Sequence, residues 1–229
     1  IEHSLFFGCT SLSSISVETG NQIYDSRNNC NAIIETSTNT LIAGCKATII
    51  PNDIVSIGED AFVYCHSLSS IEIPNGVINI GEDAFCNCGL KSIFIPSSVR
   101  NIEGNTFVYC DYLSSIVVDA DNKVYDSRNN CNAIMETSTN RLIVGCKNTV
   151  IPSNTKIIGS MAFQTGGILY DTIVIPDGVT SIEDQAFYLC EKLSKVYLPA
   201  SLSFIGKNVF ASCYLCLRFC CIHNICALL

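Results

Sequence analysis

The sequence predicts an α/β solenoid, in which short repeats stack on one another as rungs. Three observations lead to this prediction: a phrase that recurs every 22 to 24 residues, a longer unit that occurs twice, and a shift of 101 residues that relates the two halves of the chain. One strand and one helical turn in such a short repeat cannot close a hydrophobic core. Stacked rungs can, because each rung covers the apolar face of its neighbour.

The short repeat follows the phrase Ile-Gly-x-x-Ala-Phe-x-x-Cys-x-x-Leu-x-x-Ile-x-Ile-Pro, and the stretch from Ile57 to Pro74 fits it completely. The Ile-x-Ile alternation predicts a short strand, which the proline ends because it lacks an N–H. Phe62, Cys65 and Leu68 stand three residues apart, as one turn of helix would require. The phenylalanine of the phrase recurs at Phe6, Phe62, Phe85, Phe107, Phe163, Phe187 and Phe210.

Each repeat is expected to contribute one strand, and the eight strands together are expected to form a single parallel sheet. In each strand the residue between the two core positions faces outward, because strand side chains alternate. We call these eight strand centres the outer column. Its members are Ser16, Ile49, Glu72, Phe94, Val117, Val150, Val174 and Tyr197.

The longer unit runs from Tyr24 to Pro51, and its near-copy runs from Tyr125 to Pro152, with five differences in 28 positions. Two apolar runs, 32–34 and 41–43, flank a polar stretch in the first copy and predict a β-hairpin inserted into the rung. Thr38 and Asn39 are expected near its tip. We therefore predict a single solenoid over residues 1–213, a tandem duplication of about 1–101 and 102–202, followed by an atypical cysteine-rich tail over 214–229.

The composition excludes several functional classes. A formal charge of -8 and a pI near 4.8 argue against nucleic-acid binding, which needs a basic surface. Disorder is excluded by 48% hydrophobic and only 15% charged residues. No run of about 18 apolar residues is present, so we expect no membrane insertion. The three histidines occupy unrelated repeat positions, which supports neither an enzyme nor a cofactor site.

Of the 15 cysteines, those that share one repeat slot are expected to be buried thiols. Parallel side chains stacked in a column are poorly placed for disulfides. Cys30 with Cys45, and Cys131 with Cys146, remain disulfide candidates across the hairpins. The cysteines that share one repeat slot, three residues after the phenylalanine, are Cys9, Cys65, Cys88, Cys110, Cys190 and Cys213.

Two segments superficially resemble metal sites. The tail from Cys213 to Cys226 contains His223 and a Cys-x-x-Cys pair, but reproduces no zinc-module spacing. The acidic stretch from Asp119 to Asp126 lacks the glycine and glutamate of a calcium loop, and its copy 101 residues earlier is not acidic throughout. We expect no metal site in either segment.

The phrase IGEDAFVYCHSLSSIEIP resembles the repeat of the BspA-like leucine-rich repeat proteins, and the YDSRNNCNAI units resemble the hairpin-bearing variant of that family. The resemblance covers about residues 1–210. It implies a parallel β-sheet on one face of the solenoid and short helices or turns on the other. The family is typical of bacterial surface and secreted proteins that contact host matrix proteins or other cells. Because Ile1 already lies within the pattern and no signal peptide precedes it, we expect a fragment of a longer repeat region.

The resemblance implies a non-enzymatic, adhesin-like module that binds a host matrix or cell-surface protein. Exposed apolar residues on the outer column would form its binding face. The alternative is that Val, Phe and Tyr stand there only because they suit strands. A passive spacer and an intracellular scaffold remain as alternative functions. The predicted binding residues are Glu72, Phe94, Val117, Val150, Val174 and Tyr197.

Overall fold

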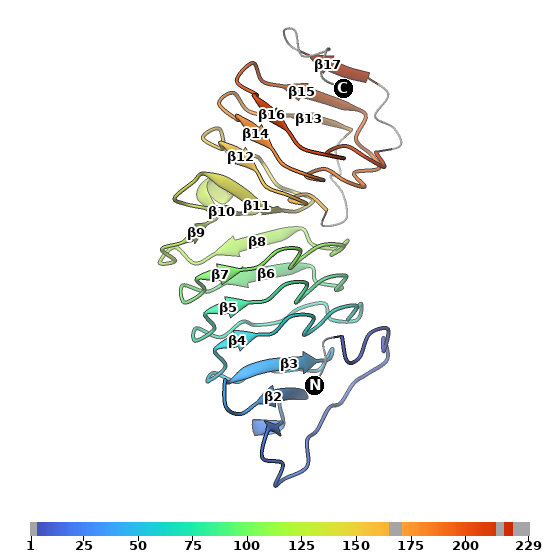
Figure 1. Cartoon of the computed structure of the whole chain (residues 1–229), viewed down its shortest axis with the longest axis vertical. Coiled ribbons are helices and arrows are strands. Elements are labelled where there is room, and N and C mark those ends of the chain that lie inside the picture. The colour runs from blue at the N-terminus through green and yellow to red at the C-terminus, as the bar shows by residue number, and fades with distance from the viewer. Residues whose placement is uncertain (1–3, 165–170, 214–217, 222–229) are drawn as a thin grey trace. The chain divides into compact units, whose positions relative to one another are not determined.

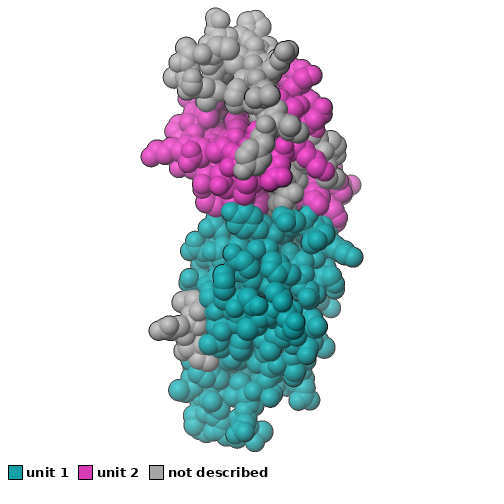
Figure 2. All heavy atoms as spheres, turned by 90° about the vertical axis from the view of Figure 1, so that its right-hand side faces the viewer, with its two compact units in different colours: residues 1–113, 118–124 teal, residues 114–117, 125–229 magenta. Residues whose placement is uncertain are grey.

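A computed structural model describes residues 4–164, 171–213 and 218–221 of the chain. The chain divides into two compact units, coloured separately in Figure 2. Unit 1 comprises residues 1–113 and 118–124, and unit 2 comprises residues 114–117 and 125–229. Each unit contains one copy of the long repeat, followed by shorter repeats.

A six-stranded sheet runs through the rungs of unit 1 in the order β1-β2-β3-β4-β5-β7 (Figure 1). The first three strands are antiparallel, and the pairs from β3 onward are parallel. Ile57, Ile80 and Ile102 are in register and buried, so the isoleucine that opens each repeat joins the core. The strands are β1 (Tyr24–Asp25), β2 (Ala32–Glu35), β3 (Thr40–Gly44), β4 (Ser56–Ile57), β5 (Asn79–Ile80) and β7 (Asn101–Ile102).

Unit 2 repeats this arrangement in the order β9-β10-β11-β12-β14-β16. Its parallel part again begins at the second strand of the hairpin, where Leu142 is in register with Ile158. The strands are β9 (Tyr125–Asp126), β10 (Ala133–Glu136), β11 (Arg141–Gly145), β12 (Ile157–Ile158), β14 (Ser181–Ile182) and β16 (Phe204–Ile205).

The strands predicted from Ile-x-Ile form a second series. The prediction is confirmed at four of the eight strand centres, because Phe94, Val117, Val174 and Tyr197 lie in strands. Ser16, Ile49, Glu72 and Val150 lie outside the strands, so a single eight-stranded sheet was wrong. In the hairpin rungs, the N–H groups of Ile49 and Val150 donate to the carbonyls of Cys30 and Cys131 instead of pairing with a neighbouring strand. The strands of this series are β6 (Ser92–Ile95), β8 (Ser115–Val118), β13 (Thr172–Val174), β15 (Lys195–Leu198) and β17 (Arg218–Cys221).

Both hairpins form as predicted. In unit 1, β2 pairs with β3, and a register shift between Ile33 and Ile34 marks a bulge. Arg27, in the short 3₁₀ turn η1 (Arg27–Asn29), ties the hairpin to its surroundings. Its guanidinium donates to Asn39 at 2.8 Å and to the carboxylates of Asp25 and Asp53 at 2.7 and 2.6 Å. In unit 2, η2 (Arg128–Asn130) holds the equivalent arginine.

The face expected to carry short helices or turns consists of turns. Asp60 and Tyr64 have φ of 58° and 60°, which interrupts any helix. Their N–H groups donate to Glu82 and Cys86 of the next rung at 3.0 and 2.9 Å. The described residues contain the two 3₁₀ turns and no α-helix. The predicted solenoid is therefore confirmed, with parallel sheets and almost no helix.

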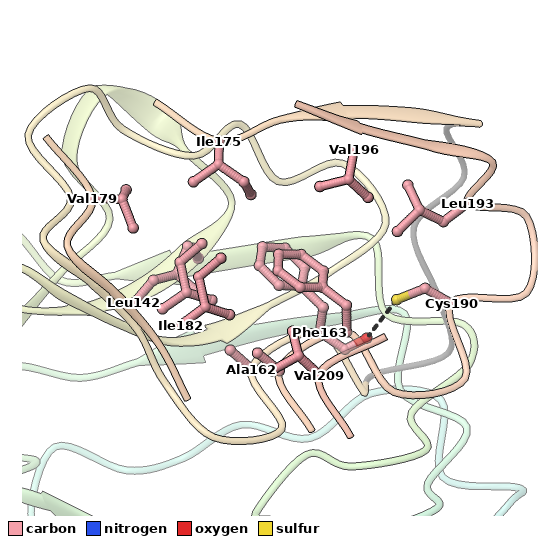
Figure 3. Close-up of a cluster of buried hydrophobic side chains, with 14 of the residues drawn as sticks. Leu142, Ala162, Phe163, Ile175, Val179, Ile182, Cys190, Leu193, Val196 and Val209 are labelled. Carbon is pink, nitrogen blue, oxygen red and sulfur yellow. Dashed lines mark hydrogen bonds between the residues drawn. The ribbon is translucent and has the colours of Figure 1, made fainter. Parts of the chain in front are cut away.

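Stacked phenylalanine rings form the centre of each core. In unit 1, Phe85 lies between Phe62 and Phe107, at centroid distances of 5.2 and 5.5 Å. In unit 2, Phe187 lies at 4.8 Å from Phe163 and 5.3 Å from Phe210. Figure 3 shows two of these rings stacked above Ala162 and beside Leu142.

A glycine of each hairpin covers the first ring of each stack. A Cβ atom on Gly44 would lie 2.1 Å from Phe62, and one on Gly145 would lie 2.4 Å from Phe163. Any larger residue would therefore displace the ring, since such contacts are shorter than atoms can approach. This contact explains why both copies of the long repeat carry glycine here.

The cysteine-rich tail is described in part. Arg218–Cys221 forms β17, which pairs with β15 in parallel. The register of Lys195 with Arg218 continues that of Thr172 with Lys195, so the spacing stays at 23 residues (195 − 172 and 218 − 195). The remaining residues of the zinc-like motif, including Cys216, His223 and Cys226, lie outside the described residues.

Candidate functional site

The outer column is exposed because its strands alternate between core and solvent. In β6, Ile93 and Ile95 are buried, while Phe94 between them is 49% exposed. In β15, Val196 and Leu198 are buried and Tyr197 is half-buried. The two-residue period of a strand produces this arrangement.

Unit 1 contributes Ser16, Ile49, Glu72 and Phe94 to the outer column. Ile49 is 74% exposed, and Glu72 is exposed as well. Both line an open groove of about 570 Å³, between the last segment of the hairpin rung and the following repeat. Phe94 lies on β6, the next strand segment along the chain.

Unit 2 contributes Val117, Val150, Val174 and Tyr197. Val150 and Val174 are 68% and 63% exposed, and Val117 is 47% exposed. Val174 and Tyr197 stand opposite each other in the parallel pair of β13 and β15. The Tyr197 carbonyl accepts a hydrogen bond from the Ile175 N–H at 2.9 Å, which fixes the register at this point. The structure thus brings two of the predicted residues side by side here.

Burial keeps several thiols of the cysteine column in their protonated, unreactive form. Burial raises the pKa of Cys65 to about 11 and that of Cys110 to about 12. Burial also raises the pKa of Cys88, so these groups stay protonated at neutral pH. Because the nucleophile is the thiolate, these three thiols offer little reactivity. A hydrogen bond with Cys190 instead lowers the pKa of Cys213.

The expected burial of the cysteine column is confirmed from Cys88 onward and is wrong for Cys9. Cys9 is exposed and Cys65 is half-buried. The first repeat packs differently, because Phe7 lies against the ring of Tyr64, with centroids 4.3 Å apart. The strictly buried column therefore begins at the third short repeat, with Cys88.

The disulfide candidates are free thiols in the structure. Cys30 donates to the Ala32 carbonyl at 3.9 Å, whereas Cys45 donates to the Asn31 carbonyl at 3.6 Å. Each sulfur has its own backbone acceptor. Cys131 and Cys146 make the equivalent contacts in unit 2.

The stretch from Asp119 to Asp126 forms a turn that leads into β9. The Asp119 carboxylate accepts from the Asp121 N–H at 2.9 Å, and the buried Asn122 amide donates to the carbonyls of Pro96 and Val99. Among the described residues, no group of three His, Cys, Asp or Glu side chains is arranged to hold a metal ion. In the same ranges, no helix is long and apolar enough to cross a membrane.

The groove at Ile49 and Glu72 was missed at the sequence level, as was the sheet of two-residue strands. A signal for the sheet exists in the isoleucines before Gly58, Gly81, Gly159 and Gly206. Two-residue strands leave no alternation to detect, however, because a period of two needs a longer run. The groove depends on missing hydrogen bonds, which leave no pattern in a sequence.

Three solved structures illustrate the similarity of the fold. A leucine-rich repeat protein from Eubacterium ventriosum is 20% identical, with a TM-score of 0.56 over 83% of this chain and 69% of that one. The pneumococcal vaccine antigen PcpA is 20% identical, with a TM-score of 0.63 over 76% of this chain and 50% of its own. A leucine-rich cell surface protein from Faecalibacterium prausnitzii is 25% identical, with a TM-score of 0.50 over 77% and 60%. The chain thus spans only part of each of these proteins.

No curated protein matches the sequence. A family described as the BspA type leucine rich repeat region matches residues 42–143 and 142–226, in six copies. These matches cover most of the chain, and they include the rungs whose phenylalanine and cysteine columns form the core. The chain therefore belongs to the BspA-type leucine-rich repeat family.

Proposed function

We propose that the chain is a non-enzymatic recognition module of a bacterial surface or secreted protein. It binds a protein partner, a host matrix or cell-surface protein, through the outer column. The observation that carries this proposal is the exposure of large apolar side chains at the same repeat position in both units: Phe94 in unit 1, and Val150 and Val174 in unit 2. Exposed apolar area with aromatic members is typical of partner sites.

Two similar structures support a surface location. One is described as a leucine-rich cell surface protein and another as a pneumococcal vaccine antigen. The family assignment supports a binding role, because stacked repeats present extended surfaces to partners. The raised pKa values of Cys65, Cys88 and Cys110 support a non-enzymatic role, since these thiols stay protonated at neutral pH.

The test is a pull-down with immobilised matrix proteins and with whole cells. Wild-type chain is compared with the double variant Phe94→Ser plus Tyr197→Ser, after both are shown to unfold at similar temperatures. Phe204→Ser serves as the control, because Phe204 is 53% exposed but lies on β16, outside the outer column. We expect the double variant to lose binding and the control to retain it.

The other outcomes contradict the proposal in distinct ways. Binding that survives in the double variant would place the site elsewhere, with the hairpins as the next candidate. No binding by the wild-type chain would favour a passive spacer.

A further inference from the structure

The groove in unit 1 has two walls made of backbone segments. One wall is the end of the hairpin rung at Thr48 and Ile49, and the other is the following repeat from Ser70 to Glu72. Its volume of about 570 Å³ falls within the range of ligand-binding clefts. Both walls occupy the repeat position that forms strands in other rungs, such as β13 and β15 in unit 2.

The walls lack the hydrogen bonds that a strand at this position normally makes. In the part of the chain that the structure describes, no backbone hydrogen bond involves the N–H or C=O groups of residues 70–73. On the opposite wall, the Ile49 N–H donates a hydrogen bond to the Cys30 carbonyl of its own rung, at 3.0 Å. In β13, residues 172–174 pair in register with residues 195–197 of the following rung, whereas residues 70–73 pair with neither of the rungs beside them. The groove therefore presents an unused strand edge.

Side chains give the groove a defined chemistry. Ile49 is 74% exposed, and Ile71 adds apolar surface on the other wall. Glu72 is the one charged residue among those that line the groove. Thr48, Asn52 and Ser70 add polar groups to the lining. The exposed isoleucine and the single carboxylate complement a segment in which apolar side chains alternate with a basic one.

We propose that this groove binds an extended peptide segment of a protein partner, which adds a strand along residues 70–73 and places a Lys or Arg beside Glu72. The inference rests on the proposed binding function and adds the class of partner. In strand addition, main-chain hydrogen bonds supply affinity, and alternate side chains supply specificity. The peptide would satisfy the backbone groups that the neighbouring rungs leave unpaired.

The duplication provides an internal comparison. The outer-column residue that corresponds to Glu72 in the second copy is Val174, and Val150 corresponds to Ile49. The second copy therefore keeps the apolar character but lacks the carboxylate. A preference for a basic peptide should belong to unit 1 alone.

The probe is a fluorescein-labelled peptide of alternating valine and threonine with one central lysine, measured by fluorescence anisotropy. We expect saturable binding to the wild-type chain. N-methylation of alternate backbone nitrogens should weaken it by at least about tenfold, because it removes strand hydrogen bonds. Glu72→Lys should bind the glutamate-bearing version of the peptide in preference to the lysine version, and Glu72→Val should abolish the preference.

Hydrogen exchange gives a second measurement. The amides of residues 70–73 should exchange rapidly in the free chain, because they have no backbone acceptor, and slowly with the lysine peptide bound. The inference is overturned if the wild-type chain binds none of the peptides, if N-methylation has no effect, or if these amides gain no protection.

The outer-column variant separates this inference from the proposed function. Phe94→Ser plus Tyr197→Ser should bind the peptide as the wild-type chain does. Suppose that the variant loses matrix-protein binding and that the wild-type chain does not bind the peptide. The proposed function then stands, and the groove inference is wrong. If the peptide binds but the variant keeps its matrix-protein partner, Phe94 and Tyr197 are not the main site, and the groove inference stands.

Discussion

The thiol of Cys88 donates a hydrogen bond to the backbone carbonyl of Phe62, one rung earlier, with 3.0 Å between Sγ and O. Cys110 makes the same bond to Phe85 at 3.0 Å, and Cys213 makes it to Phe187 at 3.2 Å. The corresponding bond from Cys190 to Phe163 is longer, at 3.9 Å (Figure 3). The cysteine column therefore links successive rungs, besides filling the core as a set of small apolar side chains.

Replacing Cys88 by alanine should lower the free energy of unfolding by about 1–3 kcal/mol, because it removes a buried donor and leaves a small cavity. Cys9→Ala is the matched control, since Cys9 occupies the same repeat slot but is exposed. Urea denaturation compares the two variants. Equal stabilities would show that the hydrogen bond to Phe62 contributes nothing measurable.

Alkaline pH should destabilise the chain. Cys110 has a pKa raised to about 12 in the folded state by burial, above its ordinary value of 9.0. A group with a raised folded pKa contributes stability below its unfolded pKa and loses it as pH rises towards the folded value. The free energy of unfolding should therefore fall from pH 9 towards pH 12, and Cys110→Ala should reduce that slope. A slope that Cys110→Ala leaves unchanged would assign the effect to other groups.

Phe85→Ala should lower the free energy of unfolding by about 3–5 kcal/mol, because the ring is fully buried between two others. Phe94→Ala is the control, since that ring is 49% exposed and should cost less than about 1 kcal/mol. Chemical denaturation measures both. A loss for Phe85→Ala as small as that of the control would mean that the stack is not the centre of the core.

Thr155→Val should stabilise the chain. The Thr155 side chain is fully buried, and its hydroxyl finds no hydrogen-bond partner among the described residues. The first copy carries Ile54 at this position, also fully buried. Replacing the hydroxyl with a methyl group removes an uncompensated desolvation cost, worth about 1–3 kcal/mol.

Thr149→Val is the matched control for that prediction. The Thr149 hydroxyl donates to the Asn132 carbonyl and accepts from the Cys146 N–H at 2.7 Å, so the same change here should destabilise. The melting temperature should rise for Thr155→Val and fall for Thr149→Val. A lower melting temperature for Thr155→Val would indicate a partner for its hydroxyl.

Repetition makes much of this fold predictable. Equivalent residues in stacked rungs occupy equivalent environments, so a phenylalanine every 22 to 24 residues predicts a continuous core. The hairpin was also predictable, because Ala32–Ile34 and Leu41–Ala43 are long enough to show two apolar runs around a polar turn. The outward exposure of Phe94 and Val174 followed from strand alternation.

Other features depend on contacts between rungs. A spacing of three between Phe62, Cys65 and Leu68 fits both a helical turn and a series of tight turns. The left-handed backbone at Asp60 and Tyr64 decides for turns, because it directs their N–H groups to the next rung. Such hydrogen bonds join residues more than 20 positions apart, where no local pattern reports them.

The stacked architecture, the duplication and the core columns can all be predicted from the sequence, because each appears as a repeat within it. Which strand positions pair depends instead on contacts between rungs, which no repeat encodes. Ile49 and Tyr197 occupy the same repeat position, yet the Ile49 N–H bonds to Cys30 within its own rung, whereas Tyr197 lies in a paired strand. The hairpin rung supplies a nearby carbonyl for the Ile49 N–H, so this donor is not used for pairing with the following rung.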